Sequence, residues 1–566
     1  MALLPFIDSS ASDWPIVKLS ENREAFVKEI VQESVRKILS HYAKADDLYD
    51  EISSTLFQEK IRITEKKWKV DPADEQEFWG DIRKQLLVNP VERNETEFKK
   101  HLEQVLESIV TRYAEEIAGQ FEMGAFKFAR NAVEQGFSYM LTTATDRSIK
   151  RLTGEKPTLN DRIHFLGNTE KIKRLSEIGT VIILPTHFSN LDSILVGWSI
   201  DKIGLPPFAY GAGINLYNNA ILGYFMNRLG AYKVDRRKKN AIYLETLKTH
   251  TQLSIQKGCH NLFFPGGTRS RKGNLEDHLK MGLLSTTIEA QEYNLFNSNG
   301  NGKKIFVVPM VINYHLVLEA NGLINDYLSH AGQEKYLEKD KSLKPWQIFK
   351  FLWKFFGLGS EIYLSYGDPK DLFGNAVDDK GNSIDKAGRV IDLKQYFTLN
   401  GAYKYDHQRD SEYTKQLAIQ IVKGFHKYNV VLSSHLVAFT AFEILLNQYK
   451  KLDLYEMMRL PADYRIISRN MLEGAVEKVL AKLNLMATKG EVILAPHLGK
   501  DTSALVNHGI RQMGVYHTTL PLRINKDGNI VSDNLKLLYY YHNRLEGYGL
   551  RSIINKKALV ETAFFG

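Results

Sequence analysis

The sequence predicts an α/β protein in which helices flank a central, mostly parallel β-sheet. Two observations lead to this fold class. From residue 179 onward, short runs of β-branched residues alternate with helical patterns, as in chains that build parallel sheets. From about residue 20 to 145, apolar residues recur near a 3.6-residue period with lysine and glutamate between them. We therefore expect a helical region before the sheet.

The expected elements follow in chain order. The first region contains helices that include residues 78–88 and 97–118. Strands are expected at 181–184, 261–264, 305–312 and 361–366, with helices between them at 241–257 and 282–293. Beyond about residue 400, helices at 413–428 and 436–449 mix with late strands near 492–495 and 516–524. This pattern predicts an N-terminal helical domain (1–145), an α/β domain (146–400) and a C-terminal α/β extension (401–566).

Composition excludes several classes of protein. Hydrophobic residues make up 43% of the 566 residues and charged residues 25%, which excludes a wholly disordered or collagen-like chain. The net charge of +9 suits phosphates or an anionic membrane surface, but it is too diffuse to indicate nucleic acid. Cys259 is the single cysteine, so no intrachain disulfide forms and an intracellular setting is expected.

No signal peptide or transmembrane helix is predicted. The N-terminal segment has a short apolar run without a basic leader. The best candidate for a membrane span, residues 430–446, is short and carries His435 and Glu443.

The most informative motif is VIILPTHFSNLD at residues 181–192. A buried strand ends at Pro185, His187 follows on the exit loop, and Asp192 falls in the first turn of the next helix. A histidine oriented by a carboxylate is a general base near neutral pH. A capped loop histidine is the alternative. The same spacing occurs at His41 and Asp46, where a helical pattern predicts a solvated helix face instead.

A second motif, NLFFPGGTRSRKG at residues 261–273, leads from an apolar strand into a loop of glycines, hydroxyls and cations. Glycine lets backbone N–H groups approach an anion, and arginine binds phosphate through paired donors. A solvated turn after an edge strand is the alternative. The candidate phosphate-binding residues are Gly267, Thr268, Arg269, Ser270, Arg271 and Lys272.

Two further runs carry weaker signals. GAYKVDRRKK at 230–239 contains four consecutive cations, which by default predict a solvated face. VVPMV at 307–311 is a strand with Pro309 at its centre, and core packing explains it equally well.

Together, in this order and spacing, the four runs resemble the glycerolipid acyltransferase family. His187 and Asp192 match its first block, 213–236 resembles the second, 264–270 the third, and Val308-Pro309 the fourth. The resemblance is strong over about 150–320 and implies the mixed, mostly parallel sheet of the acyltransferase fold. LKLLYYYHNRL at 535–545 resembles a late segment of glycerol-3-phosphate acyltransferases, and the length of the chain also favours that branch.

The resemblance implies acyl transfer from acyl-CoA or acyl-carrier protein to the sn-1 hydroxyl of glycerol-3-phosphate, which gives lysophosphatidic acid. His187 would accept the hydroxyl proton, and Asp192 would hold the imidazole tautomer. Arg236, Arg269 and Arg271 would bind the acceptor phosphate, while Pro309 would line the acyl site. Neither a metal nor a cofactor beyond the thioester co-substrate is expected.

One position departs from the family pattern. Gly266 stands where the third block usually carries a glutamate that is expected to help arrange the polar acceptor. Two alternatives therefore stay open. One is a dihydroxyacetone-phosphate or lysophosphatidate acyltransferase, and the other is a catalytically silent lipid-binding relative.

The aromatic run KPWQIFKFLWKFF at 344–356 is interleaved with lysines and predicts an interfacial helix. Its expected membrane contacts are Trp346, Phe349, Trp353, Phe355 and Phe356; a core helix with a basic edge is the alternative. We therefore expect a peripheral protein on the cytoplasmic face of the cell membrane. HLGKD at 497–501 is one residue too short to repeat the first motif and is predicted to be structural.

Overall fold

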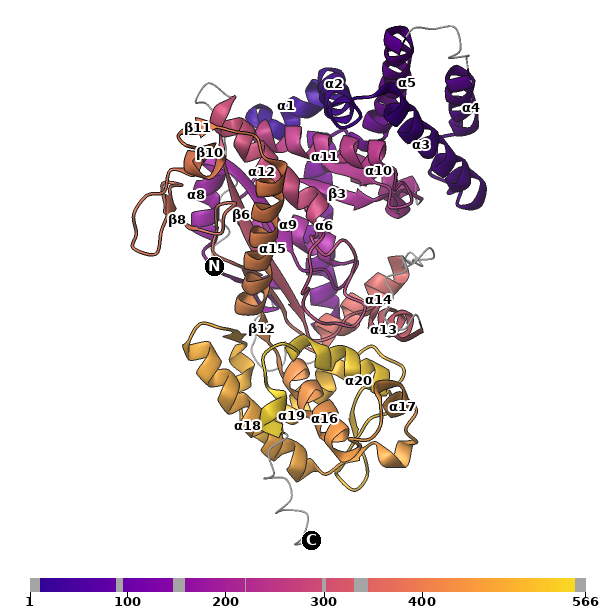
Figure 1. Cartoon of the computed structure of the whole chain (residues 1–566). Helices are drawn as coiled ribbons and strands as arrows, with labels where there is room; N and C mark the ends of the chain where they lie inside the picture. The colour runs from indigo at the N-terminus through magenta and orange to yellow at the C-terminus, as the bar shows by residue number, and fades with distance from the viewer. Residues whose placement is uncertain are drawn as a thin grey trace.

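The computed structural model describes residues 11–87, 95–145, 158–218, 220–297, 302–329 and 345–554 (Figure 1). Within these residues, a seven-stranded sheet has the order β1-β7-β6-β2-β5-β3-β4. Its strands are β1 (Ile163–Leu166), β2 (Gly179–Pro185), β3 (Ala209–Gly213), β4 (Ala231–Val234), β5 (Asn261–Leu262), β6 (Lys304–Tyr314) and β7 (Ile362–Tyr366). Among its described strands, only β6 and β7 pair antiparallel. The predicted mixed, mostly parallel α/β fold is confirmed.

The centre of the sheet is covered on both faces. Every residue of β2 is buried, as are Ile305 to Tyr314 of β6, which explains why these strands are apolar without alternation. The surrounding helices are α8 (Thr169–Ile178), α9 (Asp192–Lys202), α10 (Ala220–Arg228), α11 (Ala241–Gln256), α12 (Met281–Phe296), α13 (Ala320–Ser329), α14 (Pro345–Gly357) and α15 (His407–Tyr428). Helix α15 packs against β6 and α12.

The N-terminal region is helical, as predicted. It contains α1 (Pro15–Glu21), α2 (Arg23–His41), α3 (Ala45–Glu65), α4 (Glu75–Leu87), α5 (Glu95–Ile117) and α6 (Met123–Thr145). Helices α2 and α5 pack against α11, while α6 packs against α9 and α14. His41 ends α2 and Asp46 lies in α3; both are exposed, so this pair lies on the surface across a loop rather than within one helix.

The cationic run at 236–239 is only partly a solvated face. Arg236 and Lys239 are exposed. Arg237, however, stacks 4.2 Å from the ring centre of Trp68 and pairs with Asp71. Lys238 is buried and pairs with Glu116 of α5. These two cations hold the N-terminal helices on the edge of the sheet, so the prediction of a solvated face is wrong for them.

The C-terminal region forms a second group of helices at one end of the sheet (Figure 1). Its helices are α16 (Ser433–Gln448), α17 (Leu454–Met458), α18 (Arg469–Thr488), α19 (Thr502–Gly514), α20 (Leu535–His542) and α21 (Arg551–Ile554). Helix α16 is buried from Ser433 to Leu445 and packs against α18, α19 and α20. The apolar run at 430–446 is therefore the core of this region.

The strands of the C-terminal region are two-residue pieces: β12 (Val430–Val431), β13 (Ile466–Ile467), β14 (Ile493–Leu494), β15 (Arg523–Ile524) and β16 (Ile530–Val531). The late strands expected near 492–495 and 516–524 are thus shorter than predicted. Short antiparallel pairs also occur as β8 (Ala376–Val377) with β9 (Ser383–Ile384), and as β10 (Thr398–Leu399) with β11 (Ala402–Tyr403). In the described part of the chain, no helix combines the length and apolarity needed to cross a membrane.

Candidate active site

His187 and Asp192 lie together where β2 leaves the sheet. Nδ1 of His187 is 2.8 Å from Oδ2 of Asp192, and the two side chains are 15% and 0% exposed. Pro185 ends the strand and Asp192 begins α9, so the intervening loop turns the ring toward the carboxylate. The carboxylate accepts the Nδ1 proton, which leaves the lone pair of the neutral ring on Nε2.

The carboxylate of Asp192 is held by more than the histidine. Oδ2 also accepts hydrogen bonds from the backbone N–H groups of Phe188 and Ser189, at 2.6 and 2.8 Å. Oδ1 accepts one from the hydroxyl of Tyr314, at 2.5 Å. Tyr314 was missed in the sequence because it reaches the site through the pairing of β6 with β2, and no local motif marks it.

The glycine-rich loop after β5 lies against His187. The ring of Phe264 stacks on the imidazole with centroids 4.1 Å apart. The backbone N–H of Ser270 donates to the carbonyl of His187 at 2.8 Å. Gly267 has a φ of 76°, a left-handed conformation that favours glycine.

The cations of this loop differ in their surroundings. Arg269 is buried, with Nη1 3.4 Å from a carboxylate oxygen of Glu319. Arg271 pairs with Asp326 of α13 at 3.1 Å, and Lys272 lies 3.6 Å from Glu546. The structure therefore directs Arg271 and Lys272 toward neighbouring elements. Thr268 and Ser270 are partly exposed, and Oγ of Ser270 donates to the carbonyl of Asn274 at 2.9 Å.

A carboxylate occupies the space left by Gly266. A β-carbon added at Gly266 would lie 2.9 Å from Cγ of Glu276 and 3.3 Å from its Oε1. Oε1 of Glu276 accepts the backbone N–H of His187 at 2.9 Å, while Oε2 is buried without a hydrogen bond in the described part of the chain. Burial raises the pKa of Glu276 to about 7. Glu276 lies ten residues beyond the family position, so no motif in the sequence marks it.

The C-terminal segment 535–545 also reaches this site. The guanidinium carbon of Arg544 lies 3.5 Å from the ring centre of Phe188, and the side chain is 3% exposed. Nδ2 of Asn543 donates to the carbonyl of Lys272 at 2.8 Å. Burial lowers the pKa of Arg544 to about 10. This value is still well above neutral pH, so the guanidinium remains cationic. A buried cation therefore lies behind the loop that carries His187.

The environment of His187 keeps its ring neutral. Burial lowers the pKa of the imidazole, and the positive charges of Arg269 and Arg236 lower it further, while Asp192 acts in the opposite direction. The net effect is a pKa below the usual value. A neutral imidazole with a carboxylate on one nitrogen can accept a proton on the other.

Comparison with known families agrees with this geometry. Residues 166–313 match the family model named Acyltransferase. This stretch is therefore similar to an acyltransferase domain. It contains β2, the loop of His187, the glycine-rich loop and nearly all of β6, and such a domain supports acyl transfer in lipid synthesis.

Pro309 has a packing role in the acyltransferase domain. Its ring is buried against Gly367 and Gly424, the latter in α15. Its carbonyl accepts the backbone N–H of Gly367 at 2.8 Å. The structure thus places Pro309 between the sheet and a covering helix, whereas the resemblance implies a residue that lines the acyl site.

Two of the membrane contacts predicted on helix α14 are buried in the structure. Phe355 and Phe356 are 1% and 0% exposed, so their assignment as membrane contacts is wrong. Phe356 packs edge-on against Phe137 of α6, with centroids 6.5 Å apart. Trp353 is 45% exposed and remains a candidate. The side chains of Trp346 and Phe349 lie outside the described residues.

Proposed function

We propose that this protein transfers a fatty acyl group from a thioester to the sn-1 hydroxyl of glycerol-3-phosphate, giving lysophosphatidic acid. The observation that carries the proposal is the buried His187–Asp192 pair, whose 2.8 Å hydrogen bond commits Nδ1 and leaves Nε2 as the base. A cationic, glycine-containing loop lies directly beside it.

The chemistry needs no covalent enzyme intermediate. Nε2 of His187 accepts the proton of the acceptor hydroxyl while that oxygen attacks the thioester carbonyl. The carbon–sulfur bond then breaks, and the leaving thiolate takes the proton from the imidazolium. Asp192 stabilises the imidazolium through the hydrogen bond to Nδ1. Tyr314 and two backbone N–H groups keep this carboxylate in place.

The acceptor phosphate would bind to Arg269 and Arg236, with backbone N–H groups near Gly267 as further donors. The loop of Arg269 contacts His187 through the backbone N–H of Ser270, so an anion held by Arg269 would lie near the base. Glu276 would replace the carboxylate that Gly266 lacks, with its unbonded Oε2 toward a hydroxyl of the acceptor. This replacement favours an active enzyme over a catalytically silent relative.

Two observations favour the glycerol-3-phosphate branch and a membrane location. The segment at 535–545 that resembles these enzymes contacts the site through Asn543 and Arg544. Exposed Trp353 and Lys350 on α14 form a small surface suited to anionic headgroups. Acyl-CoA and acyl-carrier protein are both candidate donors, since each presents a thioester.

Purified full-length protein supplied with labelled glycerol-3-phosphate and a long-chain acyl-CoA or acyl-carrier protein tests the proposal. We expect labelled lysophosphatidic acid, identified by mass spectrometry, and no product from the His187→Ala variant. If only dihydroxyacetone phosphate or lysophosphatidate is acylated, that molecule is the acceptor and the proposal of glycerol-3-phosphate is wrong. No product with any donor or acceptor would reject acyl transfer.

A further inference from the structure

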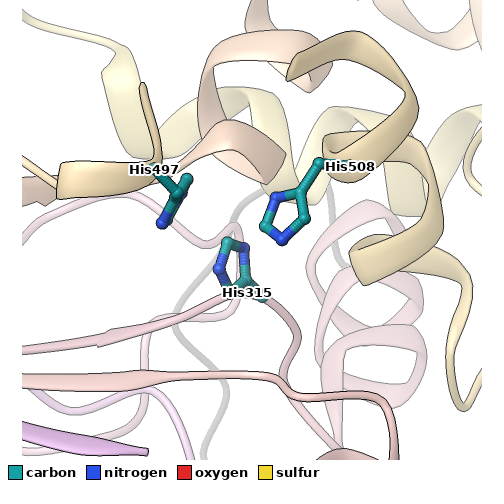
Figure 2. Close-up of side chains that lie close together, drawn as sticks. All are labelled: His315, His497 and His508. Carbon is teal, nitrogen blue, oxygen red and sulfur yellow. The ribbon is translucent and has the colours of Figure 1, made fainter. Parts of the chain in front are cut away.

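Three histidines meet where the C-terminal helices join the sheet. His315 directly follows β6, His497 lies in the short helix η7 (Pro496–Gly499), and His508 lies in α19. One ring nitrogen from each lies within 4.8 Å of the other two. Figure 2 shows the three imidazoles gathered around one point, with each ring supplied by a different element.

Each ring is oriented by a second group. The Nδ1 atoms lie near side-chain oxygens: His497 at 3.2 Å from Glu361, His508 at 2.8 Å from Ser433, and His315 at 3.1 Å from Ser434. Histidines that bind metals are oriented in the same way, by a carboxylate or another oxygen on the ring nitrogen that does not bind the ion.

Within the described residues, one ring nitrogen of this cluster has no hydrogen-bond partner. His315 is completely buried, and its Nε2 has no hydrogen bond within the described residues. A buried polar atom without a partner costs free energy, so a ligand for it is expected. Nε2 of His497 accepts the backbone N–H of Ser433 at 3.1 Å, and Nε2 of His508 lies 3.4 Å from Nε2 of Gln512. A bound ion would replace such contacts at the nitrogens that it takes.

The cluster lies close to the surface of the molecule. His497 and His508 are only partly buried, whereas His315 is fully buried. Two of the three rings therefore keep some contact with solvent.

We propose that His315, His497 and His508 bind one divalent transition-metal ion, with Zn²⁺ as the best match. Imidazole nitrogen favours zinc over magnesium or calcium, which prefer oxygen. Three protein ligands leave the fourth tetrahedral position for water. From the sequence no metal is expected, and His497 is predicted to be structural. The three histidines are far apart in the chain and form no local motif.

The ion would join two parts of the chain. His315 belongs to the end of the acyltransferase sheet, whereas His497 and His508 belong to the C-terminal region. The residue before His315 is Tyr314, which donates to Asp192. Zinc would thus fix the C-terminal region next to the strand that supports the candidate catalytic pair. This inference does not depend on the proposed function.

Zinc binding by the full chain tests this proposal. Protein stripped with a chelator is titrated with Zn²⁺ against a competing indicator, and Co²⁺ replaces Zn²⁺ for visible spectroscopy. We expect one equivalent of zinc, a tetrahedral Co²⁺ spectrum and a higher unfolding temperature with zinc. His497→Ala combined with His508→Ala should weaken binding at least about 100-fold. The control His41→Ala changes an exposed histidine and should bind zinc like the wild type.

Three outcomes would overturn the proposal. The first is no zinc binding by the wild type at micromolar concentration. The second is equal affinity in the wild type and the double variant, which would place zinc elsewhere. Circular dichroism checks folding, and the milder variant His497→Gln serves if the double variant unfolds. The third outcome is a Co²⁺ spectrum that His497→Gln leaves unchanged.

Discussion

Two loops of this protein look alike in sequence and differ in structure. His187 follows β2 and precedes α9, while His497 follows β14 and precedes α19. An aspartate lies a few residues after each histidine. Asp192 is five residues after His187, and Asp501 is four residues after His497. Asp192 turns back and binds Nδ1 of its histidine at 2.8 Å.

Asp501 instead turns forward and caps its helix. Its carboxylate accepts the backbone N–H groups of Ser503 and Ala504, at 3.0 and 3.1 Å. His497 therefore takes its carboxylate from Glu361, which is 136 residues away in the chain. Asp192, five residues after its histidine, orients the ring, whereas Asp501, four residues after His497, caps its helix.

The largest effect is expected when the candidate base, His187 of the first loop, is removed. His187→Ala should lower acyl transfer by roughly 10²- to 10⁴-fold, because the proton of the acceptor hydroxyl loses its acceptor. Circular dichroism should show an unchanged fold. The matched control is His41→Ala, which removes the histidine of the other His-x4-Asp pair and should leave the rate near that of the wild type. Equal rates for both variants would contradict the assignment.

Exchanging each aspartate for asparagine tests the comparison directly. Asp192→Asn should lower kcat by roughly 10²- to 10⁴-fold, because an amide stabilises neither the required tautomer nor the imidazolium. Asp501→Asn should change kcat by less than about twofold, because asparagine caps helices as well as aspartate. Steady-state kinetics of the two variants measures this. A severe loss in Asp501→Asn would mean that the second loop also supports catalysis.

The cationic loop that carries Arg269 lies against His187 and has no counterpart in the comparison with the loop of His497. Arg269→Ala should raise KM for glycerol-3-phosphate about tenfold or more while KM for the acyl donor changes little, since a charge-assisted contact is lost. Arg269→Lys should restore only part of the affinity, because the paired donor geometry is absent. Lys500→Ala, beside His497, should leave both constants unchanged. An increase confined to the donor would assign Arg269 to the phosphates of the donor.

A substitution at Tyr314 tests whether its hydroxyl positions Asp192 for catalysis or only supports the fold. Tyr314→Phe keeps the ring and removes the hydrogen bond to Asp192, so kcat should fall about tenfold with KM for both substrates unchanged. Thermal unfolding checks that the fold is preserved. A rise in KM without a fall in kcat would show that the hydroxyl contributes to substrate binding instead.

The last comparison concerns the two carboxylates beside the two histidine loops, and its effect is on stability rather than on the rate. Burial raises the pKa of Glu276 to about 7. For Glu361, burial opposes the shift, yet hydrogen bonds from His164, His497 and Tyr363 hold the pKa below its ordinary value. Because the folded-state pKa of Glu276 is raised, its contribution to stability is full below pH 4.5 and is lost as pH rises through 7.

Glu276→Gln removes this dependence on pH. The unfolding free energy of the variant relative to the wild type should therefore rise by about 1–3 kcal/mol between pH 5 and pH 8. Denaturant unfolding at the two pH values measures it. A difference that stays constant across this interval would mean that Glu276 does not titrate there.

Local sequence predicts the parts of the molecule that local contacts build. Apolar runs and periodicity predict β2, β5, β6 and β7, but not β1, β3 or β4. The pairing of His187 with Asp192 needs only a short loop at a strand end. Tyr314, Glu276 and Arg544 could not be predicted in the same way. Each reaches the site through strand pairing or tertiary packing, and no spacing in the chain marks it.

In helix α14 and in the cationic run at 236–239, the burial of individual side chains could not be predicted from the sequence either. Phe355 and Phe356 have the composition of membrane contacts but are covered by neighbouring elements such as α6. Arg237 and Lys238 look solvated but are paired with Asp71 and Glu116. Composition sets the character of a helix face or a charge run, but which side chains are covered depends on elements far away in the sequence.

The contact between Asn543 and the carbonyl of Lys272 has a consequence for biosynthesis. The loop of Lys272 leaves the ribosome about 270 residues before the segment that closes over it. At roughly 5–20 residues per second, that interval lasts roughly 14–54 seconds. During this time the nascent chain carries the strand and loop of His187 but not Arg544, which later lies over Phe188. The order of synthesis thus delays completion of this site until nearly the whole described chain has emerged.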